Sequence, residues 1–78
     1  MRRATVRTTH ERPQLVAAAL RPDNTDEMQT AVEGDTVVTR IERDTTGGLH
    51  STVDDYVVNV DVAERVVQTA ERHSKPKP

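Results

Sequence analysis

The closest match in this sequence to a catalytic acid–base pair is a group of three aspartates in the second half of the chain. Asp54 and Asp55 are adjacent, and Asp61 follows about two helical turns later. Paired carboxylates can donate and accept protons in hydrolysis or group transfer. Acidic residues in such a pattern far more often cap a helix or coat its solvated face. We therefore expect no catalytic residue here, and a chain that is not an enzyme.

The histidines and a glycine pair give no stronger sign of a metal or cofactor. His10, His50 and His73 have no ligand spacing among themselves, and the chain has no cysteine. We therefore interpret them as surface residues and expect no metal. Gly47-Gly48 precedes a predicted helix, where backbone N–H groups can bind an anion. It lacks the Lys-Ser/Thr of a P-loop, so a plain loop and no cofactor are expected.

Arginines concentrate in the first third of the chain, where they suit contact with nucleic-acid phosphates. The candidate RNA contacts are Arg3, Arg7, Arg12 and Arg21, with Arg2 beside them. Base stacking is excluded because the chain has one Tyr, no Phe and no Trp. The net charge of −2 adds no attraction toward nucleic acid. Charges that protect an exposed sheet edge explain the same pattern.

Hydrophobic spacing and turn residues predict a single α+β domain over residues 1–74, followed by a disordered tail at 75–78. The expected elements are a strand at 3–9, a helix from Pro13 whose body is Leu15–Leu20, strands at 28–33 and 36–43, and a long second helix. The two later strands form a hairpin around Gly34-Asp35. A right-handed crossover places the first strand beside the third. The expected architecture is β-α-β-β-α, a three-stranded antiparallel sheet of order 1-3-2 with two helices on one face.

The long helix is predicted to have two separate apolar faces. At about 100° per residue, its core stripe comprises Leu49, Val53, Tyr56, Val57, Val60, Ala63, Val67 and Ala70. Val58, Val62 and Val66 recur at i, i+4 and i+8 on a different side; we call these three residues the outer stripe. Since a helix in a small monomer needs only one apolar face, the outer stripe predicts contact with another chain. Packing against the first helix within one chain is the alternative interpretation.

The start of the long helix is expected after a loop at residues 45–48. Ser51 or Thr52 is the expected cap, because a hydroxyl oxygen can accept a free N–H of the first turn. Asp54 and Asp55 then lie near the positive end of the helix dipole.

The core available to this chain is thin, which favours a homodimer. Twelve valines and three leucines supply most of it, at roughly 1.5–3 kcal/mol for each fully buried side chain. No disulfide can supplement it, and oligomerisation is a common remedy in small domains. No apolar run approaches the length of a membrane span, and no signal peptide is recognisable. We therefore expect a cytoplasmic protein that does not bind a membrane.

Two segments resemble the smallest subunit of the archaeal KEOPS complex, the Pcc family. They are Ala19-Leu20-Arg21-Pro22-Asp23-Asn24 and Leu49-His50-Ser51-Thr52-Val53-Asp54-Asp55-Tyr56-Val57. Element order and length are similar over residues 3–72. The chain departs from many relatives at three places: His50 stands for an Arg, Asp54-Asp55 for an Asn-Ser pair, and Asn59 for an aromatic residue.

The resemblance implies a non-catalytic dimer that docks by its helices on the threonylcarbamoyl-transferase subunit of KEOPS. That complex places threonylcarbamoyl on the adenosine beside the anticodon of tRNA, so this chain would reach tRNA only indirectly. The expected partner-binding residues are Leu15, Ala18, Ser51, Asp55, Val58, Val62 and Val66. The alternative function is a free-standing RNA-binding α+β module that uses the N-terminal arginines.

Overall fold

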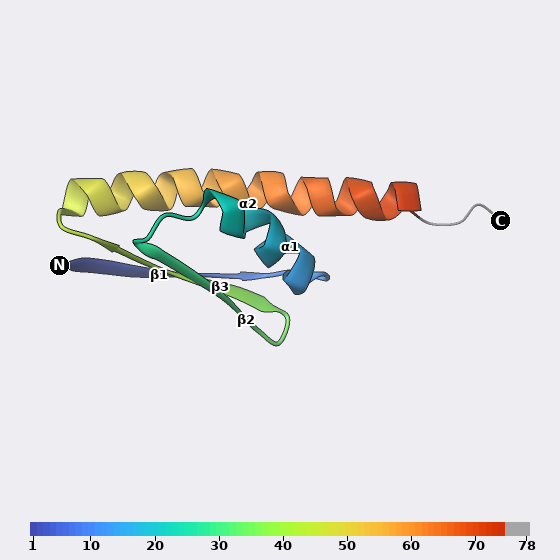
Figure 1. The fold of residues 1–78 in the computed structure, drawn as a ribbon, viewed down its shortest axis with the longest axis horizontal. Coiled ribbons are helices and arrows are strands. Elements are labelled where there is room, and N and C mark those ends of the chain that lie inside the picture. The colour runs from blue at the N-terminus through green and yellow to red at the C-terminus, as the bar shows by residue number, and fades with distance from the viewer. Residues whose placement is uncertain (75–78) are drawn as a thin grey trace.

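Six elements follow one another with short connections in an α+β fold. The computed structural model describes residues 1–74, so the tail expected at 75–78 lies outside the described residues. The elements are β1 (Arg2–Thr9), α1 (Pro13–Leu20), the 3₁₀ helix η1 (Arg21–Asp23), β2 (Met28–Glu33), β3 (Thr36–Arg43) and α2 (Thr46–Ser74). In Figure 1, α2 runs along the length of the sheet and continues beyond it.

The three strands form one antiparallel sheet in the order β1-β3-β2, which confirms the predicted topology. β3 lies in the centre, so that Thr39 is opposite Val6 on one side and Thr30 on the other. Gly34 has a φ of 64° in the turn between β2 and β3. This left-handed conformation is available at little cost to a residue without a Cβ atom, and it fixes the hairpin register.

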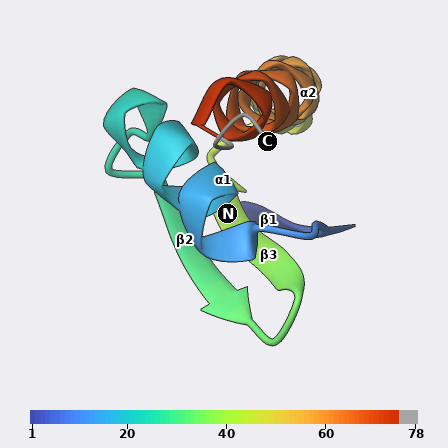
Figure 2. The same ribbon diagram turned by 90° about the vertical axis from the view of Figure 1, so that its right-hand side faces the viewer.

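Both helices cover the same face of the sheet, as Figure 2 shows. Alternate strand residues point to this inner face and meet the apolar sides of α1 and α2. The core consists of Val16, Ala17, Leu20, Val37, Ile41, Tyr56, Val60, Ala63 and Val67. The fold therefore places the core between the sheet and the two helices, and leaves the far side of each helix outside it.

A chain of hydrogen bonds crosses this core from the segment after η1 to α2. Asn24 Nδ2 donates to Thr30 Oγ1 at 2.7 Å, and Thr30 Oγ1 lies 2.8 Å from Thr39 Oγ1. Thr39 in turn bonds the hydroxyl of Tyr56. Burial raises the pKa of the Tyr56 phenol above its usual value, and the bond to Thr39 acts in the opposite direction. Asn24 and Tyr56 thus join the two segments that carry the family resemblance.

α2 begins at Thr46, which corrects the loop predicted over residues 45–48. Thr45 Oγ1 accepts the N–H of Gly48 at 3.0 Å, and this is the bond of an N-cap residue to the third helical N–H. Thr45 is therefore the cap, and the prediction of Ser51 or Thr52 was wrong. The loop was predicted because it contains two glycines, and glycine inside a helix costs about 1 kcal/mol relative to alanine.

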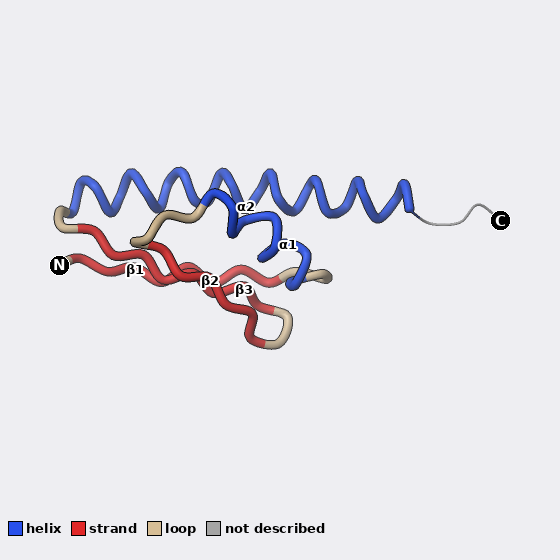
Figure 3. Tube along the Cα trace, viewed as in Figure 1, coloured by secondary structure: helices blue, strands red, loops and turns tan. Residues whose placement is uncertain are grey.

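Arg43 of β3 fastens the first turns of α2, and its Nη1 lies 3.5 Å from the carbonyl oxygen of Gly48. Arg43 Nη1 donates to Thr52 Oγ1 at 2.6 Å, and the Thr52 hydroxyl donates to the carbonyl oxygen of Gly48 at 3.0 Å. Arg43 also pairs with Glu27, its Nε lying 2.9 Å from Oε2. These contacts hold an N-terminal turn that contains two glycines. Figure 3 shows how short the loop between β3 and α2 is.

The core face of α2 agrees with most of the predicted stripe. Tyr56, Val60, Ala63 and Val67 are buried, and Leu49 and Val53 are partly buried against the core. Val57 is 52% exposed and Ala70 is exposed, so both assignments were wrong. Val57 lies at the margin of the stripe, on the side away from α1, and Ala70 follows the last core valine.

The outer face of the sheet contains one fully buried apolar residue. Val38 is opposite Arg7 of β1 and Ala31 of β2, and it has no exposed surface. Arg7 Nη1 lies 3.6 Å from Glu33 Oε1, so this ion pair spans from one edge strand to the other across β3. The long side chain of Arg7 can cover Val38 while its charged end stays in water.

Candidate protein-interaction surface

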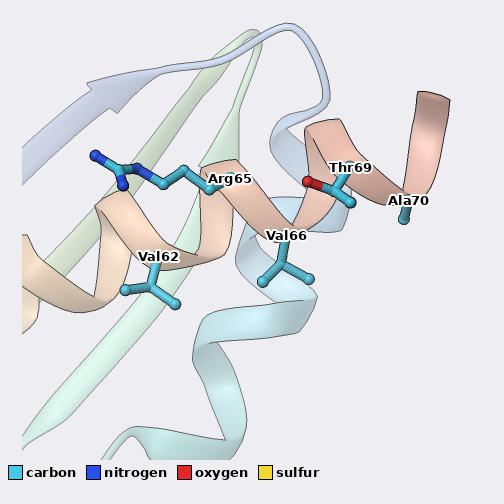
Figure 4. A pocket seen from close by; sticks show the side chains of 5 residues that line it. All are labelled: Val62, Arg65, Val66, Thr69 and Ala70. Atoms are coloured by element: carbon cyan, nitrogen blue, oxygen red, sulfur yellow. The ribbon is translucent and has the colours of Figure 1, made fainter. Parts of the chain in front are cut away.

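The outer stripe of α2 is uncovered in this chain. Val58, Val62 and Val66 are 62%, 53% and 57% exposed. Figure 4 shows the side chains of Val62 and Val66 projecting to the same side of the helix. Packing against α1 within the chain would have buried all three, so the structure contradicts that alternative.

Val62 and Val66 line two shallow depressions of the surface. The larger, about 470 Å³ and open to solvent, is lined by Val62, Arg65, Val66, Thr69 and Ala70. The smaller, about 200 Å³, lies between α1 and α2 and is lined by Ala19, Asp23, Asn59, Val62, Ala63 and Val66. Exposed valines beside a depression between two helices form a surface against which the side chains of another helix can pack.

α1 adds a smaller apolar area next to this ridge. Leu15 is 53% exposed, and Ala18 is exposed as well, so both predicted partner-binding residues are accessible. Ala19 lines the smaller depression and was not predicted. Its position four residues after Leu15 places it on the same helix face, and this spacing is the signal that the sequence offered.

The N-terminal part of the same α2 face is polar. Ser51 and Asp55 are exposed, and they precede Val62 by eleven and seven residues, which are helical repeats. Neither lines the two depressions around Val62. The structure thus leaves Ser51 and Asp55 in line with the outer stripe without bringing them into a depression.

The remaining aspartates of α2 form ion pairs along its surface. Asp54 Oδ2 lies 3.4 Å from His50 Nδ1, and Asp61 Oδ2 lies 3.2 Å from Arg65 Nη2. Both pairs have i,i+4 spacing and exposed side chains, so their contribution to stability is small. Among the side chains that the structure describes, no group of three or more His, Cys, Asp or Glu is arranged to hold a metal ion.

The candidate RNA-binding arginines do not form one patch. Arg3 and Arg7 lie on the outer face of the sheet, where Arg3 Nε is 3.1 Å from Glu42 Oε1 and Arg7 pairs with Glu33. Arg12 immediately precedes α1, and Arg21 begins η1, so they belong to elements on the opposite side of the sheet. Their positive charges are separated and partly neutralised.

His10 is buried, which corrects its assignment as a surface residue. Its Nδ1 lies 2.6 Å from Glu64 Oε2 of α2, and its Nε2 lies 2.7 Å from Thr8 Oγ1 of β1. Gln68 Nε2 donates to the other Glu64 oxygen at 3.1 Å. This cluster fastens α2 to the end of β1. No local pattern of residues indicates this contact, because His10 and Glu64 are 54 residues apart.

The structure describes the side chain of one of the other two histidines. His50 is exposed, as expected of a surface residue. The side chain of His73 lies outside the described part of the structure. The interpretation therefore changes for His10, which is not a surface residue but links β1 to α2.

The comparisons with known proteins identify no relative. A scan against protein-family models found no match, and neither did a search of curated proteins. Among the described helices, none has a stretch long and apolar enough to span a bilayer.

Proposed function

We propose that this chain is a non-catalytic accessory subunit of a KEOPS-type tRNA-modifying complex. It homodimerises in the cytoplasm and docks by α1 and α2 on the threonylcarbamoyl-transferase subunit. The single observation that carries the proposal is the uncovered outer stripe, whose Val62 and Val66 line two shallow depressions. The sequence resemblance supplies the identity of the partner.

The energetics require more than three valines. Burial of each contributes roughly 1.5–3 kcal/mol at most, and association costs about 4–15 kcal/mol in lost freedom of motion. Docking therefore needs the neighbouring apolar surface of α1, at Leu15 and Ala18, and matching polar contacts at Ser51 and Asp55. In this scheme the chain positions its partners, and tRNA is reached only through the complex.

Capture of a purified archaeal KEOPS transferase by the tagged chain tests this proposal. Val62→Asp should abolish capture, because the carboxylate would lose its water at the interface without a partner charge. Val57→Asp is the matched control: Val57 is also about half exposed but lies outside the outer stripe, and this variant should still capture the transferase.

Binding of tRNA by the isolated chain separates the proposal from the RNA-binding alternative. A subunit that reaches tRNA indirectly should bind it weakly on its own. Strong tRNA binding that falls steeply with salt, without capture of the transferase, would favour the free-standing module. In that case Arg3→Ala and Arg7→Ala should weaken RNA binding, and Val62→Asp should not.

A further inference from the structure

We infer that an arginine side chain of the transferase lies along the smaller depression, between α1 and α2, and pairs there with Asp23. This inference rests on the proposed function, because it names the chemistry of one group through which the transferase is held. It is carried by two features that the docking proposal does not use. These are the order of polar and apolar groups along the depression and a carboxylate without a partner at one end.

One end of the depression is polar and is lined by Asp23 and Asn59. Asp23 is the last residue of η1 and is exposed, and Asn59 is partly buried on α2. Within the described part of the chain, neither side chain has a hydrogen-bond or ion-pair partner, although Arg21 belongs to the same short 3₁₀ helix as Asp23. The two side chains therefore offer a carboxylate and an amide oxygen to a group from outside.

The other end of the depression is apolar. Val66 follows Asn59 by seven residues, about two helical turns, and Ala63 between them is 5% exposed and forms the floor. In Figure 1, α1 runs in the opposite direction to α2. Ala19 therefore lies nearer the end with Val66, and Asp23, four residues later, lies nearer the end with Asn59. Two helices thus build a depression that changes from apolar to acidic along its length.

This order of groups matches an arginine side chain. Its methylene stem can pack against valine and alanine while its charged end stays at the polar, accessible end of the depression. The guanidinium group carries several N–H donors in a planar fork. It can therefore donate to the Asp23 carboxylate and to the Asn59 amide oxygen together. The depression, about 200 Å³, has room for one long side chain.

Other partner side chains fit this depression less well. A leucine or an aromatic side chain would fill the apolar end, but docking would then take water from Asp23 without supplying an opposite charge, which is costly. A lysine supplies the charge, but its ammonium group is strongly hydrated and lacks the planar fork that matches a carboxylate. Arginine is the side chain that satisfies both ends.

The pair would be covered when the transferase packs on the outer stripe, because Val62 and Val66 line the same depression. Charge-assisted hydrogen bonds are strong, and removal from water strengthens them further. The pair would also fix the orientation of the transferase, since the carboxylate lies at one end of the depression only. Electrostatic matching of this kind sets the register of an interface.

Binding of a purified archaeal KEOPS transferase to three variants tests the inference, with the dissociation constant measured by isothermal titration calorimetry. Asp23→Asn keeps the shape of the side chain and removes its charge, so it should weaken binding about 10-fold or more. Asp26→Asn is the matched control and should bind like the wild type, because Asp26 is also exposed but does not line the depression. Ala19→Leu should weaken binding by filling the depression. Circular dichroism checks that each variant is folded.

Chemical labelling of the transferase identifies the side chain that occupies the depression. Phenylglyoxal modifies arginine, and mass spectrometry should show one transferase arginine that the wild-type chain protects. In the complex with Asp23→Asn, formed at saturating concentration, that arginine should be modified faster. The same comparison with an acetylating reagent should show no lysine whose protection depends on Asp23.

Failure of the inference and failure of the proposed function give different results. If the wild type binds the transferase and either Asp23→Asn or Ala19→Leu binds it equally well, docking stands and the arginine pair is wrong. Equal weakening by Asp23→Asn and Asp26→Asn would show general attraction between charges rather than a pair in the depression. Protection of a lysine in place of an arginine would also overturn the inference. If the wild type does not bind the transferase, the proposed function fails and the inference fails with it.

Discussion

The two apolar faces of α2 both contain valines, but one face is buried and the other is exposed. Val60 and Val67 are less than a tenth exposed, whereas Val62 and Val66 are more than half exposed. The sheet and α1 cover the first pair, and nothing in the described chain covers the second. Residue spacing therefore reveals two apolar faces, while the cover supplied by other elements decides which face is core.

The largest expected effect separates these faces with one substitution on each. Val60→Asp should unfold the chain, because a charge buried without a partner costs several kcal/mol, comparable with the whole stability of a small domain. Val62→Asp should remain folded and lose association. Circular dichroism and thermal melting measure the fold, and sedimentation measures association. Equal loss of structure in the two variants would show that the outer stripe is core after all.

A second variant tests how α2 is fastened on its core side. His10→Ala should lower the free energy of unfolding by about 1–3 kcal/mol, because Glu64 Oε2 and the Thr8 hydroxyl both lose their bond to the imidazole. Denaturant unfolding measures the loss. The exposed His50→Ala is the control and should change stability little. If both variants have the same stability, the contact between His10 and Glu64 contributes nothing.

A pH titration of the only tyrosine reports on the core face alone. Burial raises the pKa of Tyr56 above its usual 10.0, so the folded state favours the protonated phenol. Its contribution to stability should be complete below pH 10 and decline as the pH rises toward the raised pKa. Tyrosinate absorbance gives the pKa in the folded and unfolded chain. An unchanged pKa on unfolding would contradict the expectation.

Tyr56→Phe provides the matching mutant. It should cost about 1 kcal/mol at neutral pH, the usual net value of a buried hydrogen bond, because Thr39 keeps its bond to Thr30. The alkaline decline assigned to Tyr56 should disappear in this variant. A decline of unchanged size would assign it to other groups.

The smallest expected effect compares the two glycines in the first turn of α2. Gly47→Ala should stabilise the chain by about 0.5–1 kcal/mol, because a Cβ atom there meets nothing within 4 Å. At Gly48 an added Cβ would lie 2.9 Å from Thr45 Oγ1 and 3.2 Å from an Arg43 nitrogen. Gly48→Ala should therefore gain nothing or be destabilising. Thermal unfolding of both variants checks the pair, and an equal gain would contradict it.

The strands and the two apolar faces of α2 could be predicted from the sequence, because they depend on local periodicity. The strand order followed from the handedness of the crossover after the first strand. The start of α2 could not, since Thr45 and Arg43 hold two glycines in a helix against their propensity. His10 could not be placed either, because its partner Glu64 is 54 residues away in the sequence. In the candidate surface, the valines were predicted, and Ala19 was missed because two helices form that depression together.

The strand order affects how this protein folds while it is synthesised on the ribosome. β1 is made first, yet among the described strands it pairs with β3, in a register that joins Thr9 to Thr36 and Arg2 to Arg43. At about 5–20 residues per second, β1 waits seconds for that partner, while the β2–β3 hairpin can close as soon as it emerges. The charges of Arg3 and Arg7 thus have a use before folding is complete, because they keep a waiting strand soluble.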